Sequence, residues 1–166
     1  PPPSGPRSPE GRAADLEYAP QAAEGLLPQA GWTRSDGSWP AGRQTLSLTF
    51  RAPSDNPART AAAEHLAAGL ESLGVGVTLE LLPWADYLSA LERGEFDLYL
   101  GEVRLTADFD LTALISSGGA LNYGGYADEE ALQRLDSFRA ASGQGRDLSA
   151  RRLYQRLAEE PPFAVL

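Results

Sequence analysis

Residues 46–82 read LSLTFRAPSDNPARTAAAEHLAAGLESLGVGVTLELL, and this stretch decides the fold class. It opens on LSLTF, whose alternation is that of a strand with one buried face, and it closes on VGVTLELL, a second apolar strand. Between the two lies a helix with Pro57 at its first position, leucines along one face and Gly74 at its end. Strand, helix and strand in this order predict a parallel pair.

The same alternation continues on the C-terminal side. WADYLSALER, residues 84–93, has the spacing of a short amphipathic helix that Gly94 ends, and FDLYLGEV, residues 96–103, reads as a third strand. We therefore expect an α/β fold, a mainly parallel mixed sheet that helices flank on both faces through right-handed crossovers.

The remaining segments are shorter. The pattern predicts a short helix from Pro20, a turn at Asp36-Gly37, helices at residues 111–116, 128–141 and 148–160, and a strand in the final FAVL. Residues 1–14 (PPPSGPRSPEGRAA) have the composition of a Pro-rich linker or flexible loop. Residues 15–166 then form a single α/β unit.

Composition excludes several classes of function. The net charge of -9 and the lack of a basic, aromatic-rich patch argue against a nucleic-acid or anionic-membrane partner. No cysteine is present, so thiol enzymes and cysteine zinc sites are excluded. No methionine is present either, and we expect a processed product or an excised piece of a longer protein.

Four carboxylates lie in FDLYLGEVRLTADFDL, which spans the third strand and its exit. Asp97 is interpreted as a structural turn residue, and Asp110 as the cap of the helix that DLTALIS begins. Asp108 lies just beyond the carboxyl end of the strand, where open parallel sheets bind ligands, and suits a cationic ligand group better than catalysis. The role of Glu102, structural or ligand-binding, is left open.

Other candidates carry weaker signals. Trp84 follows a strand at the same edge and is either a core anchor or a flat wall for a ligand. Asn122 lies in the glycine-rich loop GGALNYGGY, a setting in which polar residues often contact ligands. His65 is the only histidine and is interpreted as a partly exposed helix residue, since it has no convergent partners in the sequence. No phosphate-binding glycine motif and no GxSxG are present.

The ordered set of segments resembles a known family. YAPQAAEGLLPQAGW, LSLTF with APSDNPAR, VTLELLPWADYLSALERGEFDLYLG, LNYGGYADEEALQRL and RLYQRLAEEPPFAVL together resemble the extracytoplasmic solute-binding proteins of peptide and nickel ABC transporters. The resemblance covers about residues 15–166. It implies a type II periplasmic-binding-protein fold, of which this chain is the second, inserted lobe.

The resemblance also implies roles for individual residues. Ala107-Asp108-Phe109 is similar to the family's ADY motif, whose aspartate pairs with the amino terminus of a peptide. Trp84 stands ten residues before Gly94, the spacing of a tryptophan that lines the family's pocket. GEV replaces the family's aromatic-rich GW, so Glu102 and Arg104 at the strand exit either pair with each other or make new ligand contacts.

The sequence therefore predicts the substrate-binding component of an ABC importer, without a cofactor, that holds a peptide or similar small solute between this lobe and the missing first lobe. The predicted ligand-binding residues are Asp108, Trp84, Arg104, Glu102, Phe109 and Asn122. Expected partners are the solute and the permease, and the expected location is extracytoplasmic, with a lipid anchor outside this chain. Two alternatives remain: a carboxylate-based hydrolase or metal enzyme using Asp108, Asp110 and Glu102, and a ligand-sensing module built on the same lobe.

Overall fold

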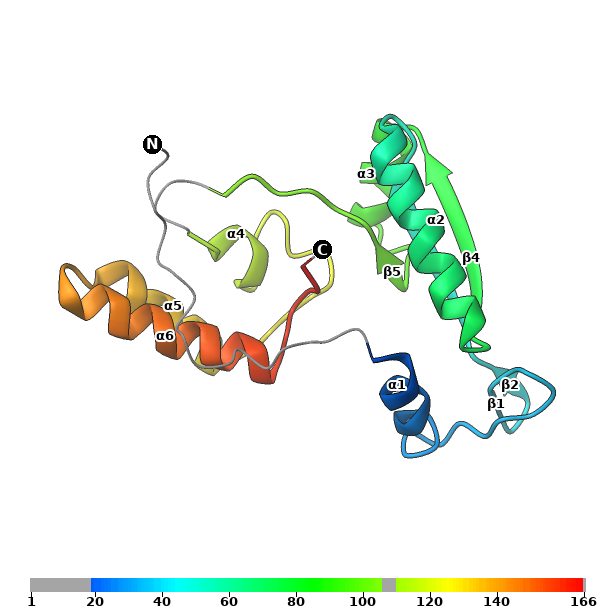
Figure 1. Ribbon diagram of the computed structural model, residues 1–166. Coiled ribbons are helices and arrows are strands. Elements are labelled where there is room, and N and C mark those ends of the chain that lie inside the picture. Colours follow the sequence, from blue (N-terminus) through cyan, green and yellow to red (C-terminus); the bar gives the residue numbers. More distant parts are fainter. Residues whose placement is uncertain (1–18, 106–109, 166) are drawn as a thin grey trace. The chain divides into compact units, whose positions relative to one another are not determined.

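The computed structural model describes residues 19–105 and 110–165 (Figure 1). Two compact units divide them: the sheet unit, residues 19–102, and the helical unit, residues 103–105 and 110–165. The prediction of one lobe over residues 15–166 stays a prediction. The predicted linker, residues 1–14, lies outside the described residues.

A three-stranded parallel sheet forms the centre of the sheet unit. Its strands are β3 (Ser47–Pro53), β4 (Gly76–Leu82) and β5 (Leu98–Tyr99), in the order β4-β3-β5. In this register Phe50 lies opposite Leu79 on one side and Leu98 on the other. The structure confirms the predicted α/β fold with a parallel sheet flanked by helices.

The third strand is shorter than predicted, and Pro53 gives a physical reason. The N–H of Leu100 donates to the carbonyl of Arg51 at 2.9 Å, which is the last rung of the β3–β5 ladder. The next rung would need the N–H of residue 53, and proline has none. The carbonyl of Leu100 instead accepts a hydrogen bond from the hydroxyl of Tyr87 at 2.8 Å. Pairing therefore stops at β5.

Helix α2 (Pro57–Ser72) covers one face of the sheet. Its small residues Ala63 and Ala67 are buried against Phe50 and Ala52 of β3. The side chain of Asn56 caps the helix by accepting from the N–H of Ala58 at 2.9 Å. The predicted helix is confirmed, but Ala63 and Ala67 are more deeply buried than its leucines.

Helix α3 (Trp84–Glu92) follows β4 after one proline. Its buried residues are Tyr87, Ala90 and Leu91, whereas Trp84 at its first position is 48% exposed. Gly94 takes the left-handed conformation that ends the helix, with φ of 67°. The helix is confirmed with a different buried face, because Tyr87 rather than Trp84 reaches the sheet.

The segment before the sheet carries a feature that the sequence did not predict. After α1 (Pro20–Leu26), strands β1 (Pro40–Ala41) and β2 (Gln44–Thr45) form a small antiparallel hairpin. Next to it Trp39 is buried, and its indole N–H donates to the carbonyl of Leu73 at 2.6 Å. Gly74, with φ of 85°, passes so close to Gly37 that a Cβ would lie 2.2 Å from its carbonyl oxygen. The hairpin segment is thus fixed to the C-terminal end of α2.

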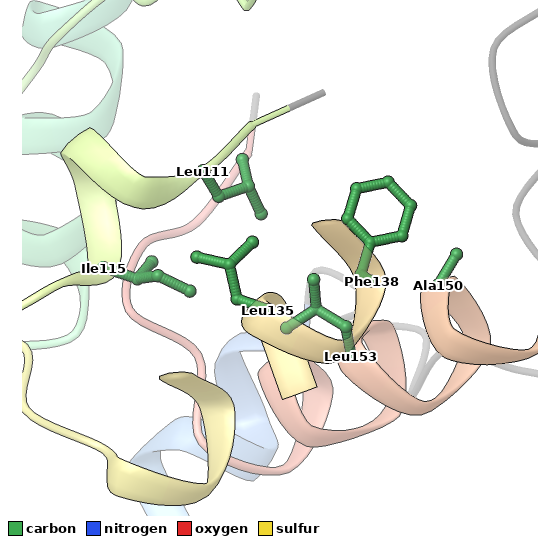
Figure 2. Close-up of a cluster of buried hydrophobic side chains, with 6 residues drawn as sticks. All are labelled: Leu111, Ile115, Leu135, Phe138, Ala150 and Leu153. Carbon is green, nitrogen blue, oxygen red and sulfur yellow. The ribbon is translucent and has the colours of Figure 1, made fainter. Parts of the chain in front are cut away.

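Three helices make up the helical unit: α4 (Thr112–Ile115), α5 (Glu129–Ala140) and α6 (Gln144–Glu159). Figure 2 shows their common core, formed by Leu111, Ile115, Leu135, Phe138, Ala150 and Leu153. A partly buried ion pair joins the start of α5 to the end of α6, with Arg156 Nη2 2.5 Å from Asp128 Oδ2. All three predicted helices are confirmed.

The predicted final strand is wrong. Residues 163–165 of the predicted FAVL strand have no strand structure, and residue 166 lies outside the described residues. Residues 19–105 and 110–165 contain no helix that is long and apolar enough to cross a membrane.

Candidate functional site

The carboxyl ends of the three parallel strands meet at one edge of the sheet, here called the sheet edge. The chain leaves β3 at Pro53 and enters α2, leaves β4 at Leu82 and enters α3, and leaves β5 for the exit segment at residues 100–102. Ligands of open α/β sheets bind at this kind of edge. Two of the predicted site residues, Trp84 and Glu102, follow strands that end there.

Trp84 packs on a buried tyrosine. Its ring lies 5.6 Å from that of Tyr87, tilted by 34°. Tyr87 is itself buried and fixed by its hydrogen bond to Leu100. Because half of the indole is open to solvent while its support is rigid, the core-anchor alternative is wrong for this tryptophan. Its role as a ligand wall stays a prediction.

Glu102 has a partner that sequence reasoning missed. The Nε and Nη2 of Arg59, in the first turn of α2, both donate to Oε2 of Glu102, at 3.1 and 2.7 Å. Asp55 lies 3.6 Å from the same guanidinium. The hydrogen bond to Glu102 is the main reason that the pKa of Arg59 lies above its ordinary value. Arg59 therefore ties the start of α2 to the exit of β5.

The signal for Arg59 was present in the sequence. Pro57 marks the first turn of a helix that begins after the carboxyl end of a strand, and Arg59 stands two residues later. Nothing in that spacing specifies an acidic partner 43 residues away, so only the strand order brings Glu102 to it. Of the two outcomes predicted for Glu102, a pair with Arg104 is not what the structure shows.

Arg104 and Asn122 belong to the helical unit. Arg104 is exposed and has no ion pair with the other described residues. Asn122 is committed to its own loop: its amide N–H groups donate to the carbonyls of Ser116 and Tyr126, and its Oδ1 accepts from the N–H of Tyr126 at 2.8 Å. Asn122 therefore organises the glycine-rich loop, and its contact with a ligand stays a prediction.

Both carboxylates expected to be structural are so. Asp110 accepts from the N–H of Thr112 at 2.9 Å and from the Thr112 hydroxyl. Leu111, not Asp110, is the N-cap residue of α4, so the cap lies one residue after the predicted position and Asp110 fixes the turn that leads into the helix. These hydrogen bonds, with a contribution from Arg139, lower the pKa of Asp110. Asp97 accepts from the N–H of Thr49 at 2.7 Å while its own N–H donates to the Thr49 carbonyl, and so extends the β3–β5 pairing.

Asp108 and Phe109 lie outside the described residues, so their predicted roles stay predictions. His65 is exposed on α2. In the part of the chain that the structure describes, no three histidine or acidic side chains gather as metal ligands would. Glu102 and Asp110, on which the enzyme alternative relied, are each bonded to residues of their own unit.

Several solved structures are similar to this chain in fold. NikZ from Campylobacter jejuni, solved with Ni(L-His), is 26% identical with a TM-score of 0.75 over 87% of this chain. The oligopeptide-binding protein AppA from Bacillus subtilis, solved with a nonapeptide, is 23% identical with a TM-score of 0.79 over 88%. A periplasmic oligopeptide-binding protein from Thermotoga maritima, solved with mannohexaose, is 21% identical with a TM-score of 0.77 over 87%.

This chain spans only part of those proteins, 31% of NikZ and of AppA and 30% of the Thermotoga protein. They have the type II periplasmic-binding-protein fold, and the 166 residues match one lobe of it. No curated protein matches the chain. The model of the bacterial extracellular solute-binding proteins, family 5 Middle, matches residues 1–121. The chain belongs to this family of bacterial extracellular solute-binding proteins.

Proposed function

We propose that this chain contributes one lobe of the binding cleft in the substrate-binding component of an ABC importer, which delivers a peptide or similar small solute to a membrane permease. Family membership and the fold support the general activity. The observation that carries the assignment of a site is Trp84, a half-exposed aromatic ring on a rigid base at the sheet edge. One part of this indole packs on Tyr87, and the exposed part offers an apolar surface to a ligand.

The residues that follow β5 support a mode of binding. Residues 101–105 are exposed, and their backbone groups make no hydrogen bond to other described residues. An extended ligand can therefore add to this segment as a strand does, through main-chain hydrogen bonds. In the proposal Asp108 binds an ammonium group of the solute, Trp84 packs on an apolar side chain, and Phe109, Glu102, Arg104 and Asn122 complete the contacts.

The relatives differ in their ligands, which leaves peptides and metal chelates as the solute classes to compare. NikZ was solved with Ni(L-His) and AppA with a nonapeptide. The further proposed partners are the first lobe, the permease subunits and, through a lipid anchor outside this chain, the outer face of the cell membrane. Closure of two lobes over the solute would give the permease a recognisable state.

Calorimetry on the full two-lobed protein tests this function, with a peptide library and nickel–histidine chelates as ligands. We expect saturable binding of at least one class. Asp108→Ala should weaken peptide binding by roughly tenfold or more, since it removes a charge-assisted hydrogen bond. Asp136→Ala is the matched control, because its side chain is 78% exposed on α5. Binding of neither class would overturn the proposed solutes, and equal affinity for Asp108→Ala and the control would overturn the role of Asp108.

A further inference from the structure

A polar hollow between α5 and α6 in the helical unit lies among residues that the proposed function does not use. We call it the α5–α6 groove, and its volume is about 430 Å³. Five residues line it, two from α5 and three from α6: Arg134, Ser137, Ser149, Arg152 and Gln155. All five side chains carry hydrogen-bond donors, and none of them is acidic.

The guanidinium of Arg134 is held in place across the groove. Its Nη1 donates to the main-chain carbonyl of Arg152 at 2.6 Å, and its Nη2 donates to Glu130 on its own helix at 2.5 Å. Its side chain is 28% exposed, so it retains open N–H groups on the groove side. The carboxylate of Glu130 balances its charge.

Arg152 has no such partner. Its guanidinium makes no ion pair or hydrogen bond with the described residues, although its backbone carbonyl is used by Arg134. The hydroxyl of Ser149 likewise has no hydrogen bond within the described part of the chain, and the only bond of the Gln155 amide is a long one of 3.4 Å to Glu159. Several donors around one hollow are therefore available, next to a guanidinium that has no ion pair with the described residues.

A second hollow in the helical unit contains an arginine that does have carboxylate partners. That second hollow is lined by Asp110, Asp136, Arg139, Ala140 and Arg146. Arg139 lies 3.5 Å from Asp110 and 3.9 Å from Asp136, so acidic side chains offset its charge. Arg152 in the α5–α6 groove differs from Arg139 in this respect, because among the described residues it has no carboxylate within ion-pair distance.

We propose that the α5–α6 groove binds a phosphate-type oxyanion. Two guanidinium groups, a free hydroxyl and an amide surround the space, and planar guanidinium donors match the paired oxygens of a phosphate. Arg152 and Ser149 bind the anion, and Arg134 presents its remaining N–H groups from a fixed position. Free phosphate and the phosphate of a lipid headgroup share this chemistry. The site is independent of the solute cleft proposed above.

Titration of the full chain with inorganic phosphate at constant ionic strength tests the site, followed by calorimetry or by the arginine Nε–H resonances. Wild type should bind phosphate saturably. Arg152→Gln should weaken binding about tenfold, the effect of losing a charged hydrogen-bond donor. Arg151→Gln is the matched control, because Arg151 is an exposed neighbour on α6 that does not line the groove. Its substitution changes the net charge equally and should leave the affinity within about twofold, since surface charge alone acts weakly.

Vesicles with anionic phospholipid headgroups form the second arm of the experiment. Binding of vesicles that Arg152→Gln weakens and Arg151→Gln spares identifies the source as a lipid headgroup. Binding of free phosphate with the same pattern, without vesicle binding, identifies a soluble phosphate. Absence of saturable binding in both arms, or equal losses in the two arginine variants, would overturn the proposal. Circular dichroism checks that both variants are folded.

Discussion

The sheet unit and the helical unit are held together in different ways. In the sheet unit, backbone pairing between parallel strands fixes the register, and small alanines let α2 approach β3 closely. In the helical unit a core of six buried side chains is supplemented by ion pairs around Arg156. The difference shows how each unit can build a site. In the sheet unit the ends of the strands position the residues of a site, whereas in the helical unit side chains on two packed helices do so.

A matched pair of core truncations tests this comparison most strongly. Phe50 and Phe138 are both 3% exposed, one in each unit. Phe50→Ala should cost about 4 kcal/mol of the free energy of unfolding, because Phe50 lies on the central strand and packs against α2, so little can move to fill the cavity. Phe138→Ala should cost less, about 3 kcal/mol, since the Arg146 guanidinium lies 4.2 Å from the ring centroid and its flexible side chain can fill part of the space.

Urea unfolding at neutral pH measures both values. Thr78→Ala, at an exposed position on β4, is the control and should change stability little. A larger loss for Phe138→Ala than for Phe50→Ala would break the comparison, because it would place the more rigid core in the helical unit.

The ion pair of the helical unit should give it a specific pH dependence. Asp128 accepts from Arg156 and from the N–H of Ala131, and these bonds hold its pKa below the ordinary value. A lowered carboxyl pKa contributes stability above the unfolded pKa of about 4, and this contribution is lost as the pH falls through the folded pKa. We expect Asp128→Asn to destabilise the chain at pH 7 and to have little effect near pH 2.

Denaturant unfolding of wild type and Asp128→Asn at pH 7 and pH 2 measures the loss of stability. Asp136→Asn, at an exposed position on the same helix, should be neutral at both. An equal effect of Asp128→Asn at pH 7 and pH 2 would mean that the pair with Arg156 does not stabilise the helical unit.

The hydrogen bond of the Tyr87 hydroxyl should contribute less to the free energy of unfolding than the core phenylalanines or the Asp128–Arg156 ion pair. Tyr87→Phe removes the donor to the Leu100 carbonyl, which Pro53 cannot replace, and should cost about 1 kcal/mol. Tyr154→Phe is the control, since that hydroxyl has no hydrogen bond among the described residues. An unchanged midpoint for Tyr87→Phe would show that the exit of β5 does not need this bond.

The pair at the sheet edge should have the smallest effect on stability. Glu102 is 62% exposed, so its attraction to Arg59 is screened by salt. Glu102→Gln should shift the unfolding midpoint slightly in low salt and not at all in roughly 0.5 M salt. A salt-independent loss would show that the pair holds the strand exit as firmly as Tyr87 does.

The sequence predicted the strands and helices well where periodicity was strong. The alternation in LSLTF and VGVTLELL identified β3 and β4, and Asp97 and Asp110 were correctly interpreted as structural residues, although Leu111 rather than Asp110 is the N-cap of α4. It failed where pairing depends on a partner. The β1–β2 hairpin was missed because its strands have two residues each, and FAVL was assigned to a strand although two prolines precede it.

By itself the sequence determined the α/β class, the parallel order of elements and the edge at which Trp84 and Glu102 lie, because these follow from local periodicity and from strand direction. Only the tertiary structure decided that Trp84 is open to solvent while Tyr87 is buried, that Arg59 is the partner of Glu102, and that Arg134 and Arg152 share one groove. Those facts join residues far apart in the chain. Their distances are set by strand order and helix packing, which no local pattern encodes.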